Sequence, residues 1–466
     1  METKRDILWR SYLIYLIMLL IGIFVFAKAL YIQQVEGNYW KSVSDSLHLE
    51  YREMDAERGT IYSEDGRMLS SSIPFFDIYL DFGAEGIQEK NGTRFKKNVD
   101  SLSIQLSAIL GGGSPVFYKR ELMGVFARQE RYHLLEKNID FNQYRALRQM
   151  SYISKNKNKN GFIFVEKEKR LAPFGLLANR TIGLSRQYLD SSGNLVSKNV
   201  GLEKTYDSLL RGVTGKRLVR RIAGGAFVPV AGSEIEPQNG KDVITTIDIN
   251  IQDIAQQALL KVMEENECTS GTCIVMEVKT GKIKAIANLG RQANGTYIED
   301  LNHAILRSEP GSTFKLITMM AALDDQFINL ESRVNIEGGK WDFSGRTVWD
   351  SERHSRTDVN YQQAFELSSN VGMAKLAVNY YYKNPQKFIS HLKRLKLDGP
   401  TGIDLEGESR PIIPNPAGKN WSNVTLPWMS FGYNLAISPL QTLTVYNAVA
   451  NGGKMMKPYL VNSIVQ

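Results

Sequence analysis

The sequence predicts an α+β protein of several domains that follow a single N-terminal transmembrane helix. Its 466 residues suggest about three structural units, and an apolar content of 43% is enough to build hydrophobic cores. An apolar stretch without charge lies at residues 11–27. Residues 231–240 have the composition of a linker and divide the remaining chain in two.

The uncharged stretch at residues 11–27 is the expected membrane-spanning element. At about 1.5 Å per residue it spans roughly 26 Å, slightly less than the ~30 Å hydrocarbon core of a bilayer. Lys28 can extend its ammonium group to the interface, and residues 29–35 lengthen the span. Basic residues precede the stretch, which indicates a cytoplasmic N-terminus and an extracytoplasmic location for the bulk of the chain.

These patterns predict the organisation of the whole chain. Residues 27–29 resemble a signal-peptidase site, but the long apolar run and Lys28 favour an uncleaved anchor. We expect a cytoplasmic tail at residues 1–10, a transmembrane anchor at 11–35, a mixed α/β pedestal at 40–235 and a second domain at 241–466. In the second domain we expect a strand hairpin over residues 272–287 and helices after Ser312, Asn370 and Ser438.

The strongest chemical signal is the pair Ser312 and Lys315, which follows Pro310-Gly311 and runs into an apolar helical stretch. Residues three apart share one face of a helix, about one turn apart. A serine hydroxyl needs a base within hydrogen-bonding reach, and a lysine with a depressed pKa can be that base. Proximity to the helix N-terminus is expected to lower this pKa. The pair therefore predicts a serine acyl-transfer site.

The Ser-x-x-Lys pattern is weak by itself, because it also occurs at Ser154 and Ser390. Ser154 lies in a polar Lys/Asn run that is typical of a solvated loop, and Ser390 lies in a basic helical stretch without a Pro-Gly entry. Only Ser312 has the setting that a nucleophile needs.

A second element lies at Ser368 and Asn370, before another helical stretch. Ser368 could relay a proton to a leaving amine, and Asn370 could hydrogen-bond Lys315 and a substrate amide. The alternative is a plain helix N-cap, for which Ser and Asn are favoured residues.

Together these residues resemble the penicillin-binding proteins, whose signature is S-x-x-K, then S-x-N, then K-T-G. Four further segments resemble the class B, monofunctional members: Arg58-Gly59-Thr60-Ile61, Gly201-Leu202-Glu203, Thr245-Thr246-Ile247-Asp248 and Ser438-Pro439-Leu440-Gln441. The resemblance implies a pedestal domain and a transpeptidase domain, the latter an antiparallel sheet with helices on both faces. Residues 72–79 and 432–439 look more like the division-type than the elongation-type members.

The third motif departs from the family pattern. Lys279-Thr280-Gly281 lies upstream of Ser312, between two apolar strands, and is expected to be a hairpin turn. No Lys-Thr-Gly or Lys-Ser-Gly follows Asn370. We therefore expect a transpeptidase domain that lacks its last strands, either because the reading frame is truncated or because half of the site has been lost.

The resemblance implies a peptidoglycan D,D-transpeptidase that binds β-lactams and acts on stem peptides ending in D-Ala-D-Ala. It also implies residence in the cytoplasmic membrane beside a membrane glycosyltransferase and other division proteins. Two alternatives stay open: a serine β-lactamase or β-lactam sensor, which shares the Ser-Lys core, and a non-catalytic scaffold, which the absent third motif allows.

Composition adds few constraints. The net charge of +8 suits a protein that faces anionic wall polymers or headgroups, and its basic runs have no nucleic-acid motif beside them, so we expect no nucleic-acid partner. The five histidines show no ligand spacing, so neither a metal nor another cofactor is expected. Cys268 and Cys273 could form a disulfide or remain free thiols.

Overall fold

The computed structural model describes residues 2–40, 49–154, 157–175, 177–183, 187–189, 195–197, 199–221 and 227–466. Within it the chain forms two compact units, which are described separately below. One unit comprises Met1–Glu57 and Arg211–Gly240, and the other comprises Arg58–Leu210 and Lys241–Gln466.

The first unit contains the long helix α1 (Glu2–Gln34) and a three-stranded antiparallel sheet. The segment Tyr12–Gln34 of α1 is long and apolar enough to cross a membrane, and its most apolar stretch of 18 residues has a mean hydropathy of 2.6. The sheet has the order β1-β8-β9, formed by β1 (Leu49–Met54), β8 (Gly215–Arg221) and β9 (Phe227–Ile235).

Strand β9 corrects the linker prediction for residues 231–240. Its last five residues, 231–235, belong to the strand rather than to a linker, and Glu234 and Ile235 pair with Arg217 and Lys216 of β8. Pairing with β8 gives the backbone of this segment the hydrogen-bond partners that a strand needs, and composition alone does not report such pairing.

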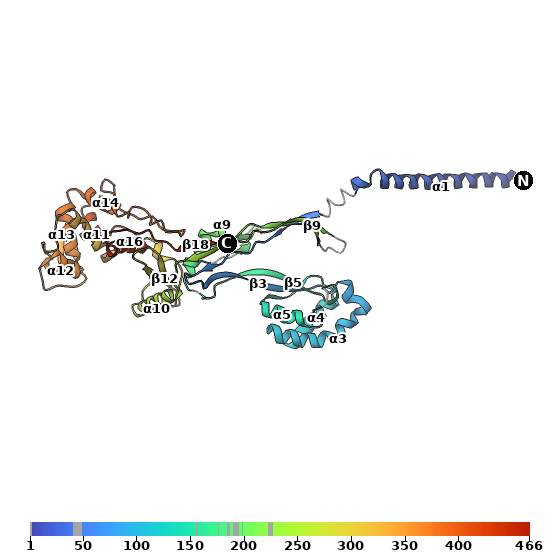
Figure 1. Cartoon of the computed structure of the whole chain (residues 1–466), viewed down its shortest axis with the longest axis horizontal. Helices are drawn as coiled ribbons and strands as arrows, with labels where there is room; N and C mark the ends of the chain where they lie inside the picture. Colours follow the sequence, from blue (N-terminus) through green and yellow to red (C-terminus); the bar gives the residue numbers. More distant parts are fainter. Residues whose placement is uncertain are drawn as a thin grey trace. The chain divides into compact units, whose positions relative to one another are not determined.

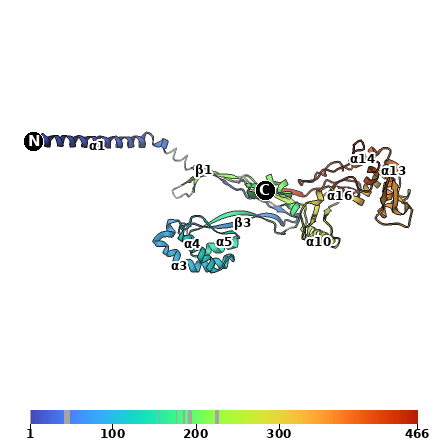
Figure 2. The ribbon, with the colours of Figure 1, turned by 180° about the vertical axis from the view of Figure 1, so that it is seen from behind.

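The first half of the second unit is built on the long strand β3 (Met68–Leu80). β5 (Phe162–Leu171) pairs with β3 over ten residues, and β4 (His133–Ile139) pairs with the end of β3. Figures 1 and 2 show α3, α4 and α5 lying along β3 and β5. Their apolar faces and β3 share one buried cluster, which includes Phe76, Ile78, Phe95 and Leu122.

These helices start and stop at recognisable residues. α4 (Pro115–Ala127) begins with Pro115 at its first position and with Ser114 as its N-cap, and α5 (Phe141–Gln149) begins with a capping box at Asp140. α3 (Glu85–Leu110) is interrupted by non-helical backbone at residues 89–92 and ends at Gly111, whose φ is +69°.

The same sheet continues into the second half of the unit in the order β18-β10-β2-β3-β4. Its remaining strands are β2 (Ile61–Tyr62), β10 (Asp242–Thr245) and β18 (Val461–Val465). Shorter elements of this unit are α6 (Lys157–Asn160), α7 (Asn179–Ile182), β6 (Gln187–Leu189), β7 (Leu195–Ser197), α8 (Gly201–Thr205) and α9 (Asp207–Leu210).

A separate antiparallel sheet, in the order β11-β12-β13, carries the expected hairpin. Its strands are β11 (Ser270–Met276), β12 (Ile283–Arg291) and β13 (Tyr297–Ile298). Alternate residues face opposite sides. Cys273 and Ala285 pack with α10 (Ile249–Glu265), whereas Ile274 and Ile286 pack in a cluster with Leu440 of α16 (Pro439–Ala450). The expected sheet with helices on both faces is confirmed.

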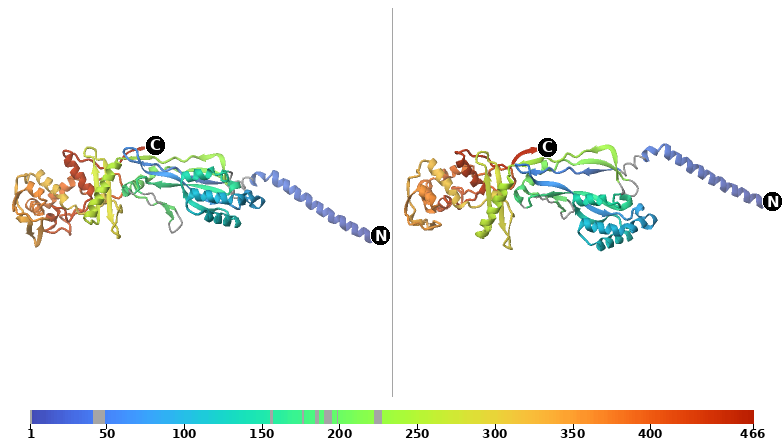
Figure 3. Two further views of the ribbon diagram at one scale, coloured as in Figure 1. Left: turned by 90° about the horizontal axis from the view of Figure 1, so that it is seen from below. Right: turned by 60° about the horizontal axis from the view of Figure 1, so that its bottom comes forward.

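The remaining helices form a helical group with its own large core, drawn in orange in Figure 3. Its elements are η2 (Gly311–Phe314), α11 (Lys315–Asp324), α12 (Tyr361–Glu366), α13 (Asn370–Tyr381), α14 (Pro385–Arg394) and α15 (Thr425–Met429), with the small strands β14 (Arg333–Asn335), β15 (Lys340–Phe343), β16 (Arg346–Trp349) and β17 (Asp358–Asn360) and the 3-10 turn η3 (Glu337–Gly339). The short turn η1 (His303–Ile305) belongs instead to the cluster that contains Ile286 and Leu440.

Candidate active site

Ser312 and Lys315 lie where a 3-10 turn becomes an α-helix. Ser312 is the second residue of η2, and Lys315 is the first residue of α11. The Lys315 Nζ lies 3.1 Å from the Ser312 Oγ, within hydrogen-bonding distance. Ser312 is exposed, whereas Lys315 is only 1% exposed. The turn therefore presents the hydroxyl to solvent and buries the amine beneath it.

A close backbone contact fixes this turn. The Gly311 N–H donates to the carbonyl of Gly432 over 3.1 Å. Gly432 has a φ of +91°, and a Cβ at this position would lie 2.0 Å from the Gly311 carbonyl oxygen. Any side chain at residue 432 would therefore displace the turn that carries Ser312.

The pKa of Lys315 is lowered to about 8, chiefly because burial disfavours the charged ammonium. The negative charge of Asp350 acts in the opposite direction and raises this pKa. The direction agrees with the sequence-based prediction. The cause differs, because burial within the helical group, rather than the helix N-terminus, dominates the shift.

Ser368 completes the surroundings of the amine. Its Oγ lies 3.0 Å from the Lys315 Nζ, and its carbonyl oxygen also accepts a hydrogen bond from Nζ. Ser368 has a φ of +50°, the left-handed region, which turns both of its oxygens toward Lys315. The helix N-cap is the next residue, Ser369, whose hydroxyl accepts the N–H of Gly372. Ser368 is thus left for contact with the lysine.

The expected hydrogen bond between Asn370 and Lys315 is wrong. The Asn370 amide Nδ2 donates instead to the carbonyl of Trp349 over 2.6 Å. An ammonium group has three donors, and those of Lys315 are matched by Ser312 and by the two oxygens of Ser368. Asn370 therefore lies beside the Ser312–Lys315–Ser368 cluster and is fixed from the β16 side.

The other candidate motifs fall elsewhere. Lys279-Thr280-Gly281 lies in the β11–β12 turn, where Gly281 has a φ of +84°, so the hairpin prediction is confirmed. The hydroxyls of Ser154 and Ser390 donate to the carbonyls of Ser151 and Lys387.

A cleft of about 440 Å³ adjoins the Ser312 turn. It is lined from the turn side by Pro310 and Thr313, from β11 by Thr272 and Ile274, and from α16 by Tyr446. The Tyr446 hydroxyl donates to the carbonyl of Thr313, which ties α16 to the turn.

Sequence reasoning did not find two neighbours of the candidate site, namely Trp349 and Asp350 at the end of β16. They contact Asn370 and Val371, about twenty residues further along the chain. No spacing rule connects a short strand to a later helix, so the sequence offered no signal for this contact.

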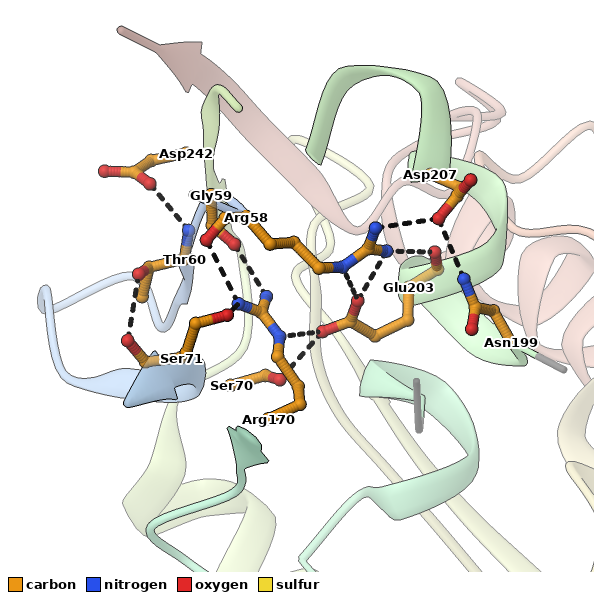
Figure 4. Close-up of polar contacts among 11 residues, drawn as sticks. Arg58, Gly59, Thr60, Ser70, Ser71, Arg170, Asn199, Glu203, Asp207 and Asp242 are labelled. Atoms are coloured by element: carbon orange, nitrogen blue, oxygen red, sulfur yellow. Dashed lines mark hydrogen bonds and ion pairs between the residues drawn. The ribbon is translucent and has the colours of Figure 1, made fainter. Parts of the chain in front are cut away.

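A buried ionic cluster joins two of the segments on which the family resemblance rests (Figure 4). Glu203 is fully buried and accepts hydrogen bonds from Arg58 at 2.9 Å and from Arg170 at 2.8 Å. Arg58 also pairs with Asp207, and Arg170 donates to the carbonyl of Gly59. Buried charges need such partners. Residues from the Arg58 and Gly201 segments thus meet in one cluster.

One group of side chains has the geometry of a metal site, although no ligand spacing in the sequence pointed to it. Atoms of Asp324, Asp325 and His391 lie within 4.8 Å of one another. The same carboxylates pair with Arg394 at 2.7 Å and Lys387 at 3.1 Å, so cations of the chain itself already neutralise them. Cys268 and Cys273, whose state the sequence left open, are free thiols.

The site and the fold define a class of protein. An exposed serine with a buried lysine at hydrogen-bonding distance, where a 3-10 turn becomes an α-helix, is the arrangement of a serine acyl-transfer enzyme.

Comparison with known proteins makes the class specific. The family described as Penicillin binding protein transpeptidase domain matches residues 271–466, and the Penicillin-binding Protein dimerisation domain matches residues 53–245. The chain is 27% identical to the peptidoglycan D,D-transpeptidase FtsI of Buchnera aphidicola, over 96% of this chain and 74% of that protein. It is 26% identical to the probable peptidoglycan D,D-transpeptidase PenA of Neisseria gonorrhoeae, over 92% of this chain and 69% of that protein.

A solved structure shares the fold. Penicillin Binding Protein 2X from Streptococcus thermophilus superposes with a TM-score of 0.69 at 20% identity, over 89% of this chain and 61% of that one. The two domains, in this order, place the chain among the class B penicillin-binding proteins, which are serine-type peptidoglycan transpeptidases.

Proposed function

We propose that the chain is a D,D-transpeptidase that cross-links peptidoglycan stem peptides through an acyl-enzyme on Ser312, and that penicillin acylates the same residue. The observation that carries the proposal is the 3.1 Å approach of a buried lysine amine, with its pKa lowered to about 8, to an exposed serine hydroxyl. A neutral amine in this position can accept the serine proton.

In the first half-reaction the Ser312 Oγ attacks the carbonyl of the penultimate D-Ala, and the hydroxyl proton passes to the Lys315 Nζ. When the tetrahedral intermediate collapses, the bond to the terminal D-Ala breaks, and the leaving amine takes a proton through the Ser368 hydroxyl. The contact of Nζ with both hydroxyls supports this relay, since one amine can take the proton from Ser312 and return it through Ser368.

In the second half-reaction an amine of a neighbouring stem peptide attacks the ester carbonyl. A new amide forms, the ester bond to Ser312 breaks, and the proton lost by the attacking amine returns to the Ser312 oxygen. The cleft of about 440 Å³ beside the turn is the candidate site for one of the two stem peptides. The proposal keeps Asn370 as a contact for a substrate amide through its side-chain oxygen, since its amide nitrogen donates to the Trp349 carbonyl.

The cellular setting is part of the proposal. The apolar segment of α1 would anchor the protein in the cytoplasmic membrane, with its N-terminus inside and the catalytic domain outside. A role in division, beside a membrane glycosyltransferase and other division proteins, is supported by the similarity to FtsI proteins. Localisation of a fluorescent fusion tests this setting: a signal spread along the side wall would contradict the division role.

Labelling with fluorescent penicillin tests the chemistry. Membranes that contain the full chain are treated with the label, and the acylated peptide is identified by mass spectrometry. The expected site is Ser312, and Ser312→Ala should abolish labelling without changing the unfolding transition, because an exposed hydroxyl contributes little to packing. Ser390→Ala is a matched control, since Ser390 also has a lysine three residues later and lies on a helix. Labelling that survives in Ser312→Ala would contradict the assignment, and rapid release of the label would indicate a β-lactamase instead.

A further inference from the structure

The carboxylate of Asp350 is buried at the start of α13, the helix that begins with Asn370. Its side chain is 1% exposed, and its Oδ1 accepts the backbone N–H of Val371 over 2.9 Å. Val371 is the second residue of α13 and Asn370 the first. The first N–H groups of a helix have no partner within the helix, and a negative charge there is favourable. Asp350 therefore fixes the first turn of α13.

Trp349, the residue before Asp350, contacts the side chain of Asn370. The carbonyl of Trp349 accepts the Asn370 amide over 2.6 Å. The backbone N–H of Asp350 donates to the carbonyl of Gly339 over 2.9 Å, which anchors this short segment to the turn before β15. Gly339 has a φ of +89°, and a Cβ there would lie 3.1 Å from the Asp350 Cβ. The end of β16 is thus built tightly against α13.

The second oxygen of Asp350 has a titratable neighbour. Asp350 Oδ2 lies 3.6 Å from His354 Nε2, an ion-pair distance, and neither atom has a hydrogen-bond partner in the part of the chain that the structure describes. A buried carboxylate is costly without a partner. The remaining nearby charges on α13 and η3, Lys375 and Glu337, pair with each other.

The charge of Asp350 also affects the pKa of Lys315, the proposed base. Its negative charge raises the pKa of Lys315, against the larger lowering by burial, and no other charged side chain in the described residues has a resolved effect on that amine. The charge of Lys315 changes during the reaction, because the amine becomes an ammonium when it takes the serine proton. A fixed negative charge nearby stabilises this ammonium.

We propose that Asp350, with His354 as its partner, is a positioning residue of the acyl-transfer site: it holds the turn that carries Ser368 and Asn370, and its charge stabilises the ammonium that forms on Lys315. Only the second part of this inference, the stabilisation of the Lys315 ammonium, rests on the proposed function. The first part, the fixing of the turn, is a property of the fold and can be measured without any reaction.

Hydrogen–deuterium exchange of the full chain tests the first part. Asp350→Ala should raise exchange at residues 368–372 by roughly tenfold or more, because a charge-assisted hydrogen bond to the helix is lost. Asp350→Asn keeps an oxygen at the position of Oδ1 and should leave this exchange near the wild-type value. Asp342→Ala is a matched control on the same hairpin, since Asp342 is exposed on β15. Unchanged exchange in Asp350→Ala would overturn the positioning role.

The pH dependence of penicillin acylation tests the second part. Asp350→Asn removes the charge but keeps the shape, so the rise of the rate with pH should move to lower pH while the maximal rate falls by roughly tenfold. A purely structural role would lower the rate without moving the pH profile, and a profile identical to that of the wild type would overturn the electrostatic part. Absence of acylation in the wild type would count against the proposed function, whereas the exchange result would still decide the positioning role.

Discussion

The pKa of Lys315 leads to a quantitative prediction for the rate of acylation. If the neutral amine is the base, the rate follows the neutral fraction, which is roughly a tenth at pH 7 and about half at pH 8 for a pKa of about 8. The rate constant for labelling by fluorescent penicillin should therefore rise about fivefold between pH 7 and 8 and level off near pH 9.

An ordinary lysine would behave differently. With a pKa near 10.4 the neutral fraction rises about tenfold for each pH unit through pH 9, so the total gain from pH 7 to 9 would be roughly a hundredfold instead of about tenfold. Initial rates at each pH, corrected for hydrolysis of the free label, separate the two cases.

Substitution of the base provides the control. Lys315→Arg keeps a positive charge but cannot lose its proton, so acylation should fall by orders of magnitude at every pH. Near-normal acylation in Lys315→Arg, or a wild-type rate that is flat from pH 6 to 9, would refute the view that Lys315 is the base.

Two further predictions concern stability. Glu203→Gln should lower the free energy of unfolding by about 3–5 kcal/mol, because the charges of Arg58 and Arg170 lose their buried counterion. The control Glu406→Gln, which breaks an exposed pair with Lys204, should cost less than about 1 kcal/mol. Equal effects of the two substitutions in urea titrations would contradict the importance of the buried cluster. Burial raises the pKa of Glu299 to about 7, so the folded state binds more protons than the unfolded chain between about pH 4.5 and 7. The free energy of unfolding should therefore fall by roughly 3 kcal/mol as the pH rises through this window. Glu299→Gln should remove this pH dependence, and an unchanged dependence would show that another group causes it.

Much of the local structure could be predicted from the sequence. Alternating apolar residues predicted the β11–β12 hairpin, and the Thr-Gly pair predicted its turn, because strand periodicity and turn chemistry depend on neighbouring residues. The spacing of three residues placed Ser312 and Lys315 on one face of a helical turn, and the structure places their reactive atoms 3.1 Å apart.

Contacts between distant segments could be predicted from the sequence only in part. The sequence singled out Ser368 and Asn370 but assigned Asn370 the wrong partner, because the direction of a side chain at a helix start depends on what packs against it. Here the left-handed backbone of Ser368 directs its oxygens to Lys315, and the end of β16 takes the Asn370 amide. The linker prediction for residues 231–235 was wrong for a similar reason, since β9 extends to Ile235 and its end pairs with β8.

By itself the sequence determined the class of fold, the order of the domains, the candidate nucleophile and the candidate base, all of which depend on residue type and short spacings. The tertiary structure decided the burial that lowers the pKa of Lys315 and the position of Asp350, whose negative charge raises it. It also decided the hydrogen bond between Arg58 and Glu203, which are 145 residues apart. Burial and long-range charge depend on how helices and sheets pack together, and no single segment encodes that arrangement.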